Sequence, residues 1–261
     1  MNVGECRFFP DANVVIGLIL REHRNGPQNS YYLKAVQENK LVNTILPSVE
    51  EEFHERLDEV ADEAGKILDA IHQELWKEKS LGASKARTIQ IGLKDVPLME
   101  QALSQVFGSM SRQSVDGRGS SRFHTVFDLV TSWIMMHWTK VMTKGTSVDL
   151  DELVDELKLA ISNGRQELED SLLLLKAQLR HVPSDWAVDQ KIAARVQPWV
   201  PDSDDVTHIA SVATFVSIKS ARGLFVTNDN EVLRNAPDIK RESGATVTRP
   251  AFALAVFLAD L

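Results

Sequence analysis

The chain has 261 residues, of which 43% are hydrophobic and 25% are charged, and its formal net charge at pH 7 is −8. These values exclude a disordered or fibrous protein and allow either one large domain or a domain with a sizeable insertion. The acidic net charge argues against a protein that coats nucleic acid, because neutralising phosphates requires a basic surface. Cys6 is the only cysteine, which excludes an internal disulfide and a cysteine-rich zinc site. No secretory signal is visible, so we expect a cytoplasmic protein.

The first predicted elements are a short buried strand over Arg7–Asp11 and a helix over Val14–Leu20. Asp11 therefore stands at the carboxyl end of a strand, where open α/β sheets place their ligand sites. Another helix is predicted over Tyr31–Glu38, followed by a short strand over Asn43–Leu46.

A long helix is predicted from Pro47 to about Trp76, because apolar residues recur there at helical spacing. The segment Ser48-Val49-Glu50-Glu51 fits a capping box, which assigns Glu51 a structural role. Glu50 and Glu52 lie on either side of Glu51 and remain candidates for a functional site.

Residues 58–200 are predicted to form a mostly helical insertion between two parts of an α/β core, residues 1–57 and 201–261. An amphipathic helix is predicted over Leu98–Met110. The apolar run Phe123–Met142 is predicted to be the buried helix of a bundle and not a membrane span, because polar and charged residues interrupt it. Four large side chains of this run are assigned to the core: Trp133, Met135, Met136 and Trp138.

The remaining parts of the insertion carry weaker signals. Ser111–Ser121 is predicted to be a loop because it is rich in serine and glycine. An apolar stripe over Leu150–Leu179 predicts a helix that breaks into a hairpin at Ser162-Asn163-Gly164. We expect no strands in the insertion.

After Pro201 the α/β character returns. Asp205 is predicted to open a helix that runs to about Ser220 and ends at Gly223, while Asp204 is predicted to cap it or to act as an extra ligand. The predicted strand Leu224–Thr227 follows, and Asp229 lies at its carboxyl end. Three further elements complete the chain: a helical turn over Glu231–Asn235, a strand over Thr246–Thr248 and a closing helix over Pro250–Leu261.

Acidic residues thus adjoin predicted buried elements at both ends of the chain. Burying an ionised carboxylate without a partner costs several kcal/mol, so a convergence of such groups requires cations or shared protons. Mg²⁺ and Mn²⁺ favour oxygen ligands from a few carboxylates and bridge to phosphate. This pattern predicts metal-dependent phosphodiester chemistry. His208 lies on the third acidic segment and is predicted to be a structural histidine with its hydrogen bonds satisfied.

Four segments carry these acidic residues in order: Phe9-Pro10-Asp11-Ala12-Asn13, Leu46-Pro47-Ser48-Val49-Glu50-Glu51-Glu52-Phe53, Asp205-Val206-Thr207-His208-Ile209-Ala210 and Val226-Thr227-Asn228-Asp229. Their order and their strand or helix context resemble the PIN domain, a family of metal-dependent nucleases. The tail Thr246–Phe252 is similar to the last strand and proline-led helix of that family.

The resemblance implies an α/β fold: a three-layer core with a parallel sheet, carrying here a large all-α insertion. It implies that Asp11, Glu52, Asp205 and Asp229 are the metal ligands and catalytic residues, with Mg²⁺ or Mn²⁺ as the cofactor. Position within the motif favours Glu52 over Glu50. Two neighbouring side chains would support the metal site: Thr227 and Asn13.

The resemblance further implies a hydrolase, an endoribonuclease that acts on single-stranded RNA. From Lys77 to Arg122 the chain has eight Lys or Arg residues against four acids, so this part of the insertion is locally basic. Four of its residues are the candidates for RNA binding: Lys85, Arg87, Arg118 and Arg122.

Other functions stay open on sequence grounds. Flap-type DNA nucleases use a related acidic site. A PIN-like scaffold with weak or no catalysis could instead bind a protein inhibitor or partner through the helical insertion, and a homodimer is also open. A sheet that binds a nucleotide cofactor is disfavoured because no glycine-rich phosphate-binding loop is present.

Overall fold

The computed structural model describes residues 6–20, 26–80, 89–113, 126–128, 130–132, 134–136 and 147–259. These residues fall into two compact units. The first unit consists of Met1–Glu55 together with Leu168–Leu261, and the second of Arg56–Glu167. The predicted insertion ended at residue 200, whereas residues 168–200 belong to the first unit, because α7 (Gln190–Val196) packs against α8 (Ser203–Lys219) there.

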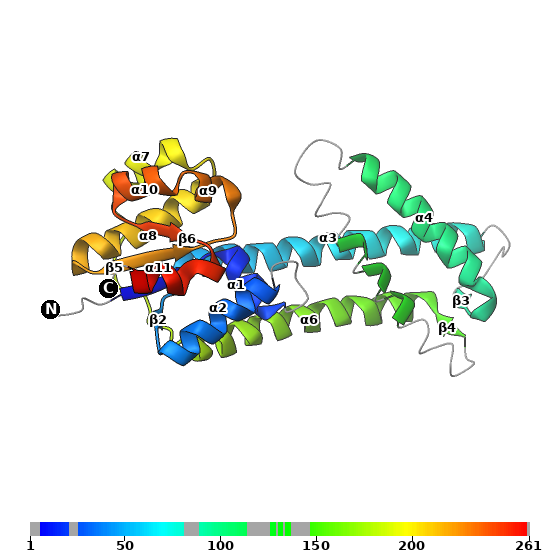
Figure 1. The fold of residues 1–261 in the computed structure, drawn as a ribbon. Helices are drawn as coiled ribbons and strands as arrows, with labels where there is room; N and C mark the ends of the chain where they lie inside the picture. The colour runs from blue at the N-terminus through cyan, green and yellow to red at the C-terminus, as the bar shows by residue number, and fades with distance from the viewer. Residues whose placement is uncertain are drawn as a thin grey trace. The chain divides into compact units, whose positions relative to one another are not determined.

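The first unit contains a four-stranded parallel sheet with the strand order β2-β1-β5-β6 (Figure 1). β1 (Cys6–Pro10) pairs along its whole length with β5 (Arg222–Val226), from Cys6 opposite Arg222 to Pro10 opposite Val226. The outer strands are β2 (Val42–Asn43) and β6 (Thr246–Thr248). This arrangement confirms the predicted α/β class with a parallel sheet. All four carboxyl ends lie at the same edge of the sheet, since the strands are parallel.

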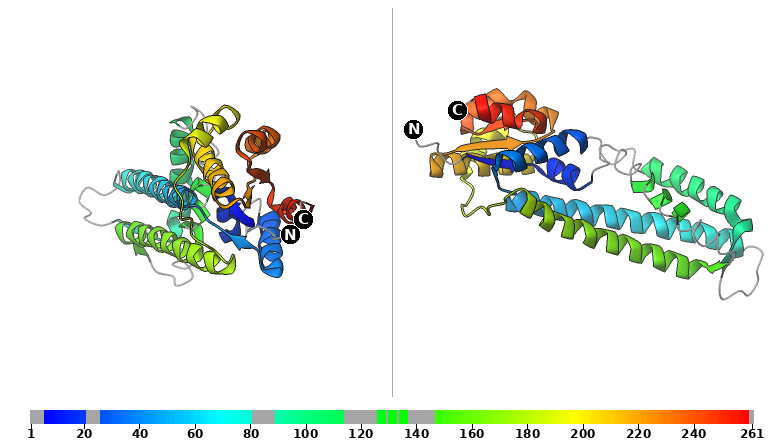
Figure 2. Two further views of the ribbon diagram at one scale, coloured as in Figure 1. Left: turned by 90° about the vertical axis from the view of Figure 1, so that its left-hand side faces the viewer. Right: turned by 60° about the horizontal axis from the view of Figure 1, so that its bottom comes forward.

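Helices cover both faces of this sheet. Successive side chains of a strand point to opposite faces, and Phe8 and Phe9 show where each face packs. The ring centroid of Phe8 lies 5.7 Å from that of Phe257 in α11 (Ala253–Ala259), whereas the centroid of Phe9 lies 5.3 Å from that of Phe215 in α8. A further view shows these helices on either side of the strands (Figure 2). The sheet is therefore buried on both faces, as its apolar strands require.

Three more helices lie in the N-terminal part of the chain, and the last of them continues from the first unit into the second. They are α1 (Ala12–Ile19), α2 (Gly26–Asn39) and α3 (Pro47–Ser80). The predicted long helix is confirmed, but the predicted capping box is wrong. Because α3 begins at Pro47, Ser48 lies inside the first turn and cannot cap it, and the backbone N–H of Glu50 donates to the carbonyl of Leu46 (3.0 Å).

Gly223 lies within β5, and the prediction that it ends the preceding helix is wrong. Ser220 takes that role, with a φ of 48° in the left-handed region. Gly223 instead allows α8 to approach the sheet. A Cβ at this position would lie 2.8 Å from Cγ1 of Val212 and 2.9 Å from Cγ2 of Val216, so glycine is required by packing and not by a turn.

The C-terminal elements follow the prediction with small shifts of their limits. η2 (Gln197–Trp199) precedes α8, and the predicted helical turn is α9 (Asn230–Arg234). α10 (Ala236–Ser243) was not predicted, because Pro237 and a charged sequence conceal it. The predicted closing helix consists of η3 (Pro250–Phe252) followed by α11.

The second unit has a hydrophobic core of its own, built by α3, α4 (Val96–Gln113) and α6 (Leu150–Gln178). The predicted break at Ser162-Asn163-Gly164 is wrong, since α6 is continuous there. A glycine inside a helix costs only about 1 kcal/mol, and the long apolar stripe on either side outweighs that cost. The stripe is buried at these positions: Leu150, Leu153, Leu157, Ile161, Leu172 and Leu175.

Two short strands in the second unit contradict the expectation of an all-helical insertion. β3 (Gln90–Ile91) pairs antiparallel with β4 (Val148–Asp149), and η1 (Leu93–Asp95) follows β3. Strands of this length show no alternation in the sequence, which explains why they were missed. The predicted loop Ser111–Ser121 begins within α4 and then passes outside the described residues.

The described residues of the predicted buried helix Phe123–Met142 are helical, and Val126, Phe127, Val130 and Ile134 are buried. The assignment of Met135 and Met136 to the core is wrong, because both are exposed, while Trp133 and Trp138 lie outside the described residues. None of the helices that the structure describes has the length and apolar character needed to cross a membrane.

Candidate metal centre

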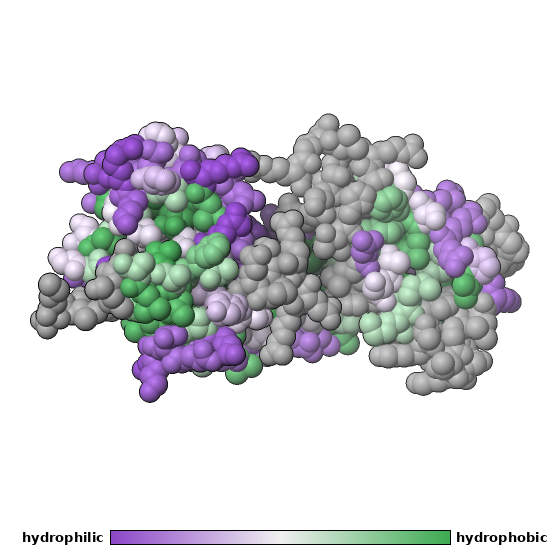
Figure 3. Space-filling model, viewed as in Figure 1, coloured by the Kyte–Doolittle hydropathy of each residue, from purple (hydrophilic) through white to green (hydrophobic). Residues whose placement is uncertain are grey.

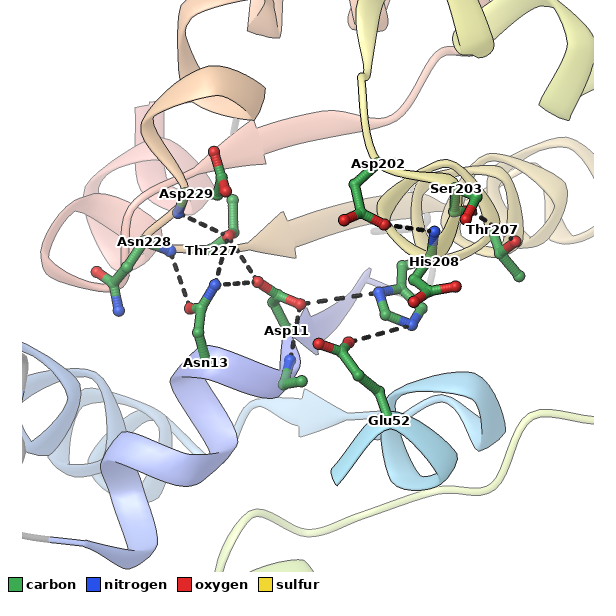
Figure 4. A network of polar contacts seen from close by, with 12 residues as sticks. Asp11, Asn13, Glu52, Asp202, Ser203, Thr207, His208, Thr227, Asn228 and Asp229 are labelled. Atoms are coloured by element: carbon green, nitrogen blue, oxygen red, sulfur yellow. Dashed lines mark hydrogen bonds and ion pairs between the residues drawn. The ribbon is translucent and has the colours of Figure 1, made fainter. Parts of the chain in front are cut away.

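Asp11 is held in one orientation at the carboxyl end of β1 (Figure 4). It caps α1, and its Oδ1 accepts a hydrogen bond from the backbone N–H of Ala12 (2.7 Å). Its Oδ2 accepts one from the hydroxyl of Thr227 (2.8 Å) and one from the side-chain amide of Asn13. The side chain of Asp11 is only 3% exposed. Its carboxylate is thus fixed before any ligand binds.

Thr227 and Asn13, the two residues expected to support the site, both lie beside Asp11. The Thr227 hydroxyl, while donating to Asp11, accepts the backbone N–H of Asp229 (2.9 Å). The Asn13 side-chain oxygen accepts the backbone N–H of Asn228 (3.2 Å). These bonds tie the carboxyl end of β1 to that of β5.

Glu52 reaches the same place from the start of α3, and His208 from α8 (Figure 4). Nδ1 of His208 lies 3.7 Å from Oδ1 of Asp11, and Nε2 lies 3.8 Å from Oε2 of Glu52. The three residues each offer one ligand atom, and these atoms lie within 4.8 Å of one another. Three segments distant in the sequence therefore converge on one point.

His208 differs from its prediction as a satisfied structural histidine. It is fully buried, at 0% exposure, and neither ring nitrogen has a hydrogen-bond partner among the described residues. Burial lowers the pKa of His208. The charge of Glu52 and the backbone of Ser48 oppose this shift, but less strongly. The Ser48 backbone is near the ring without meeting ordinary hydrogen-bond geometry. The ring is therefore neutral at pH 7, and one of its nitrogens has a free lone pair.

Asp205 is half-buried on α8, one turn before His208. Burial, and to a lesser extent the charges of Asp11, Asp229, Asp202 and Glu52, together raise the pKa of Asp205 to about 8. The four carboxylates expected to be ligands therefore repel one another through space.

Asp229 has a structural role that the sequence did not reveal. It caps α9, with Oδ1 accepting the backbone N–H groups of Glu231 (2.6 Å) and Val232 (3.2 Å). It lies outside the tightest group of ligand atoms, which is formed by Asp11, Glu52 and His208.

Two further candidates, Glu50 and Asp204, are not part of the close group of Asp11, Glu52 and His208. Glu50 forms an ion pair with Lys176 of α6, so Glu52 is the glutamate of this segment that faces Asp11 and His208. Asp204 is exposed, and the prediction that it caps α8 is wrong: the helix begins earlier, and Asp202 caps it by accepting the backbone N–H of Asp204 (2.9 Å).

The four basic candidates for RNA binding lie outside the described residues: Lys85, Arg87, Arg118 and Arg122. The sequence prediction gave His208 a structural role and did not include it among the ligands. Its signal was the spacing Asp205-Val206-Thr207-His208, because residues three apart share one face of a helix and can reach the same ion.

Comparisons of the chain with protein-family models, with curated proteins and with solved structures find no match. The function of this site must therefore be argued from its geometry.

Proposed function

We propose that the first unit is a PIN-like nuclease core that hydrolyses phosphodiester bonds, with single-stranded RNA as substrate and Mn²⁺ or Mg²⁺ as cofactor. The observation that carries this proposal is the convergence of Asp11, Glu52 and His208, whose ligand atoms lie within 4.8 Å of one another at the carboxyl edge of a parallel sheet. Asp205 and Asp229 complete the acidic set. After burial, the charges of Asp11, Asp229 and Glu52 are among the causes that raise the pKa of Asp205, so these carboxylates interact.

The donor groups fit a divalent ion. Burial is the largest cause of the raised pKa of Asp205, and the charges of the neighbouring carboxylates add to it; a cation would offset both the burial of charge and the repulsion. A bound divalent ion would polarise the scissile phosphate and lower the pKa of a water. The chain supplies the orientation: Asp11 is held by Ala12, Asn13 and Thr227, so its carboxylate needs no reorganisation when a ligand arrives.

The proposal is tested by incubating the protein with one end-labelled oligonucleotide sequence, prepared as single-stranded RNA and as single-stranded DNA. Each is tested with Mn²⁺, with Mg²⁺ and with EDTA. We expect internal cleavage of the RNA with the metals and none with EDTA. Asp11→Asn should lower the rate by at least about 100-fold, because even outer partners of metal ligands contribute 10–100-fold. Asp204→Asn is the matched control, since it removes the same charge from an exposed position.

Each contrary result has a definite meaning. Cleavage that persists in EDTA or in Asp11→Asn would refute the metal centre. Faster cleavage of DNA than of RNA would make the protein a DNA nuclease. If the wild-type protein cleaves neither nucleic acid yet binds RNA, the core acts as a binding module with weak or no catalysis.

A further inference from the structure

His208 is placed like a metal ligand, not like a core histidine. A buried polar atom without a hydrogen bond costs about 1–3 kcal/mol, and His208 has two such atoms, Nδ1 and Nε2. Both nitrogens face carboxylates, Asp11 on one side and Glu52 on the other, at distances too long for hydrogen bonds. An ion placed among these groups would remove the cost by taking the lone pair of one nitrogen.

The second ring nitrogen also faces a carboxylate in that arrangement. Histidines that bind metals usually donate the N–H of their other nitrogen to a carboxylate, which fixes the orientation of the ring. Whichever nitrogen of His208 binds the ion, the opposite nitrogen faces a carboxylate, 3.7 Å away for Asp11 or 3.8 Å for Glu52, which could accept a hydrogen bond from its N–H once the side chains move closer. Asp205 lies one helical turn away, and such an acidic residue and histidine, three apart on a helix, form a known ligand pair.

We propose that His208 is a ligand of the metal centre and that the centre therefore prefers Mn²⁺ to Mg²⁺. This inference rests on the proposed metal centre but not on nuclease activity. Mg²⁺ favours an all-oxygen environment and keeps several waters, whereas the divalent transition metals, Mn²⁺ among them, accept an imidazole nitrogen beside carboxylates more readily than Mg²⁺ does. One nitrogen among carboxylates accordingly shifts the preference toward Mn²⁺.

The first test needs no variant. Pulsed electron paramagnetic resonance of the protein with one equivalent of Mn²⁺ detects directly bonded ¹⁴N. We expect ¹⁴N modulation typical of imidazole in the wild-type protein. The second test measures Mn²⁺ and Mg²⁺ binding by calorimetry. His208→Gln should lose the ¹⁴N signal and weaken Mn²⁺ binding by about tenfold or more, while Mg²⁺ binding changes less. His54→Gln is the matched control, because His54 is a more exposed histidine that pairs with Glu169.

The outcomes separate this inference from the proposed function. Mn²⁺ binding that depends on Asp11 but shows no ¹⁴N modulation would overturn the role of His208 and leave the metal centre standing. Equal loss of Mn²⁺ and Mg²⁺ affinity in His208→Gln would overturn the selectivity. No Asp11-dependent binding of either metal would instead remove the proposed function itself.

A separate observation concerns a cavity of about 730 Å³ in the first unit, beyond Asp229. Its wall includes Asn230, which directly follows Asp229, and Thr248, whose carbonyl accepts the backbone N–H of Thr227 (3.0 Å). The cavity thus lies beside the carboxyl ends of β5 and β6. Arg234 and Arg249 bring two positive charges to it.

Aromatic and basic groups are combined in this cavity. Phe252 lines it and is 58% exposed, although it is a large apolar side chain. Figure 3 shows that hydrophobic residues gather over α11, bordered by hydrophilic residues over α10. Arg249 is held in place by donating to the side-chain oxygen of Asn230 (2.7 Å). Single-stranded nucleic acids are bound by such pairs, with a base stacked on the aromatic ring and the phosphates facing arginine.

We infer that this cavity binds the nucleotide next to the cleaved bond of a single-stranded nucleic acid, with the base on Phe252 and a phosphate on Arg249 or Arg234. The inference rests on the proposed function, from which it takes the substrate class. It assigns substrate binding to described residues of the first unit, independently of the basic run in the insertion.

The test is fluorescence anisotropy with a labelled single-stranded RNA in EDTA, where no cleavage occurs. Phe252→Ala and Arg249→Ala should each weaken binding by about tenfold, and Arg249→Ala should also flatten the dependence on salt. Leu258→Ala and Arg195→Ala are the matched controls, because each removes an exposed side chain of the same kind outside the cavity. Unchanged affinity and salt slope in both cavity variants would overturn the inference, and the metal-dependent cleavage by the wild-type protein would still stand.

Discussion

Oδ1 of Asp11 and Nδ1 of His208 lie 3.7 Å apart, with both side chains almost completely buried. The carboxylate accepts hydrogen bonds from Ala12, Asn13 and Thr227, whereas the imidazole has no hydrogen-bond partner in the part of the chain that the structure describes. This contrast is unusual for the interior of a folded protein, where buried polar groups are almost always paired. A bound ion, as proposed above, would account for it, since the ion would complete the bonding of the ring and offset the charge of the carboxylate.

Asp205 should make the metal-free protein less stable as the pH rises. Its folded pKa of about 8 lies above its unfolded value of 3.8, so the folded state keeps a proton that the unfolded state has lost. Raising the pH toward 8 therefore removes stability, by up to about 1.4 kcal/mol per pH unit. His208 has a lowered pKa and acts in the opposite direction only below pH 6.5, so the window from 6.5 to 8 isolates Asp205.

The measurement is urea unfolding in EDTA at several pH values within that window. Asp205→Asn should abolish the loss of stability, because asparagine carries no charge at any pH. Asp204→Asn should leave the slope as in the wild type. A wild-type stability that stays flat from pH 6.5 to 8 would show that burial and the neighbouring carboxylates do not keep Asp205 protonated as inferred.

Asp229 should have two separable roles. In EDTA, Asp229→Ala should lower the free energy of unfolding by about 1 kcal/mol, because it removes the cap that binds the N–H groups of Glu231 and Val232. Asp229→Asn should retain stability, since asparagine caps helices equally well. Both variants should lose metal-dependent cleavage. If the stable Asp229→Asn protein cleaves at the wild-type rate, Asp229 only caps the helix and has no role in the metal centre.

Gly223 should resist substitution because of packing. Gly223→Ala should destabilise the protein by about 1–3 kcal/mol, as expected when a methyl group is forced into a packed core against stiff valine side chains. Gly65→Ala offers a control of opposite sign: nothing lies within 4 Å of a Cβ there, and alanine favours a helix by about 1 kcal/mol. If Gly223→Ala is as stable as the wild type, α8 does not pack on β5 as closely as described.

Mn²⁺ should raise the melting temperature of the wild-type protein. A ligand that binds only the folded state stabilises it by about 2.7 kcal/mol at 100 times its Kd. Asp11→Asn should show no such shift, while Asp204→Asn should shift like the wild type. An equal shift in Asp11→Asn would mean that Mn²⁺ binds elsewhere on the protein.

The sequence predicted those parts of the site that depend on local pattern. The strand before Asp11 could be predicted because Phe8 and Phe9 mark a buried run that ends at a polar residue, and both are fully buried. The helix that carries Glu52 could be predicted from its apolar stripe. The choice of Glu52 over Glu50 rested on the family resemblance, and Lys176 supplies a physical reason for it by pairing with Glu50.

Other features depend on contacts between distant segments, which no local pattern contains. His208 lies between Asp11 and Glu52 only because α8, α3 and the end of β1 meet around it. The pairing of β3 with β4 joins residues near 90 and 148, and strands of two residues leave no periodicity to detect. Capping by Asp202 was missed because three aspartates follow Pro201 within a few residues, and propensity alone does not choose among them.

The most direct measurement of the central claim is a crystal structure of the protein soaked in Mn²⁺, with anomalous scattering recorded to locate the metal. The account predicts an anomalous peak among the side chains of Asp11, Glu52 and His208, and its loss in crystals of Asp11→Asn. Well-diffracting crystals with no peak at this position, or with a peak only at a different group of residues, would contradict the claim that these three residues form a metal centre.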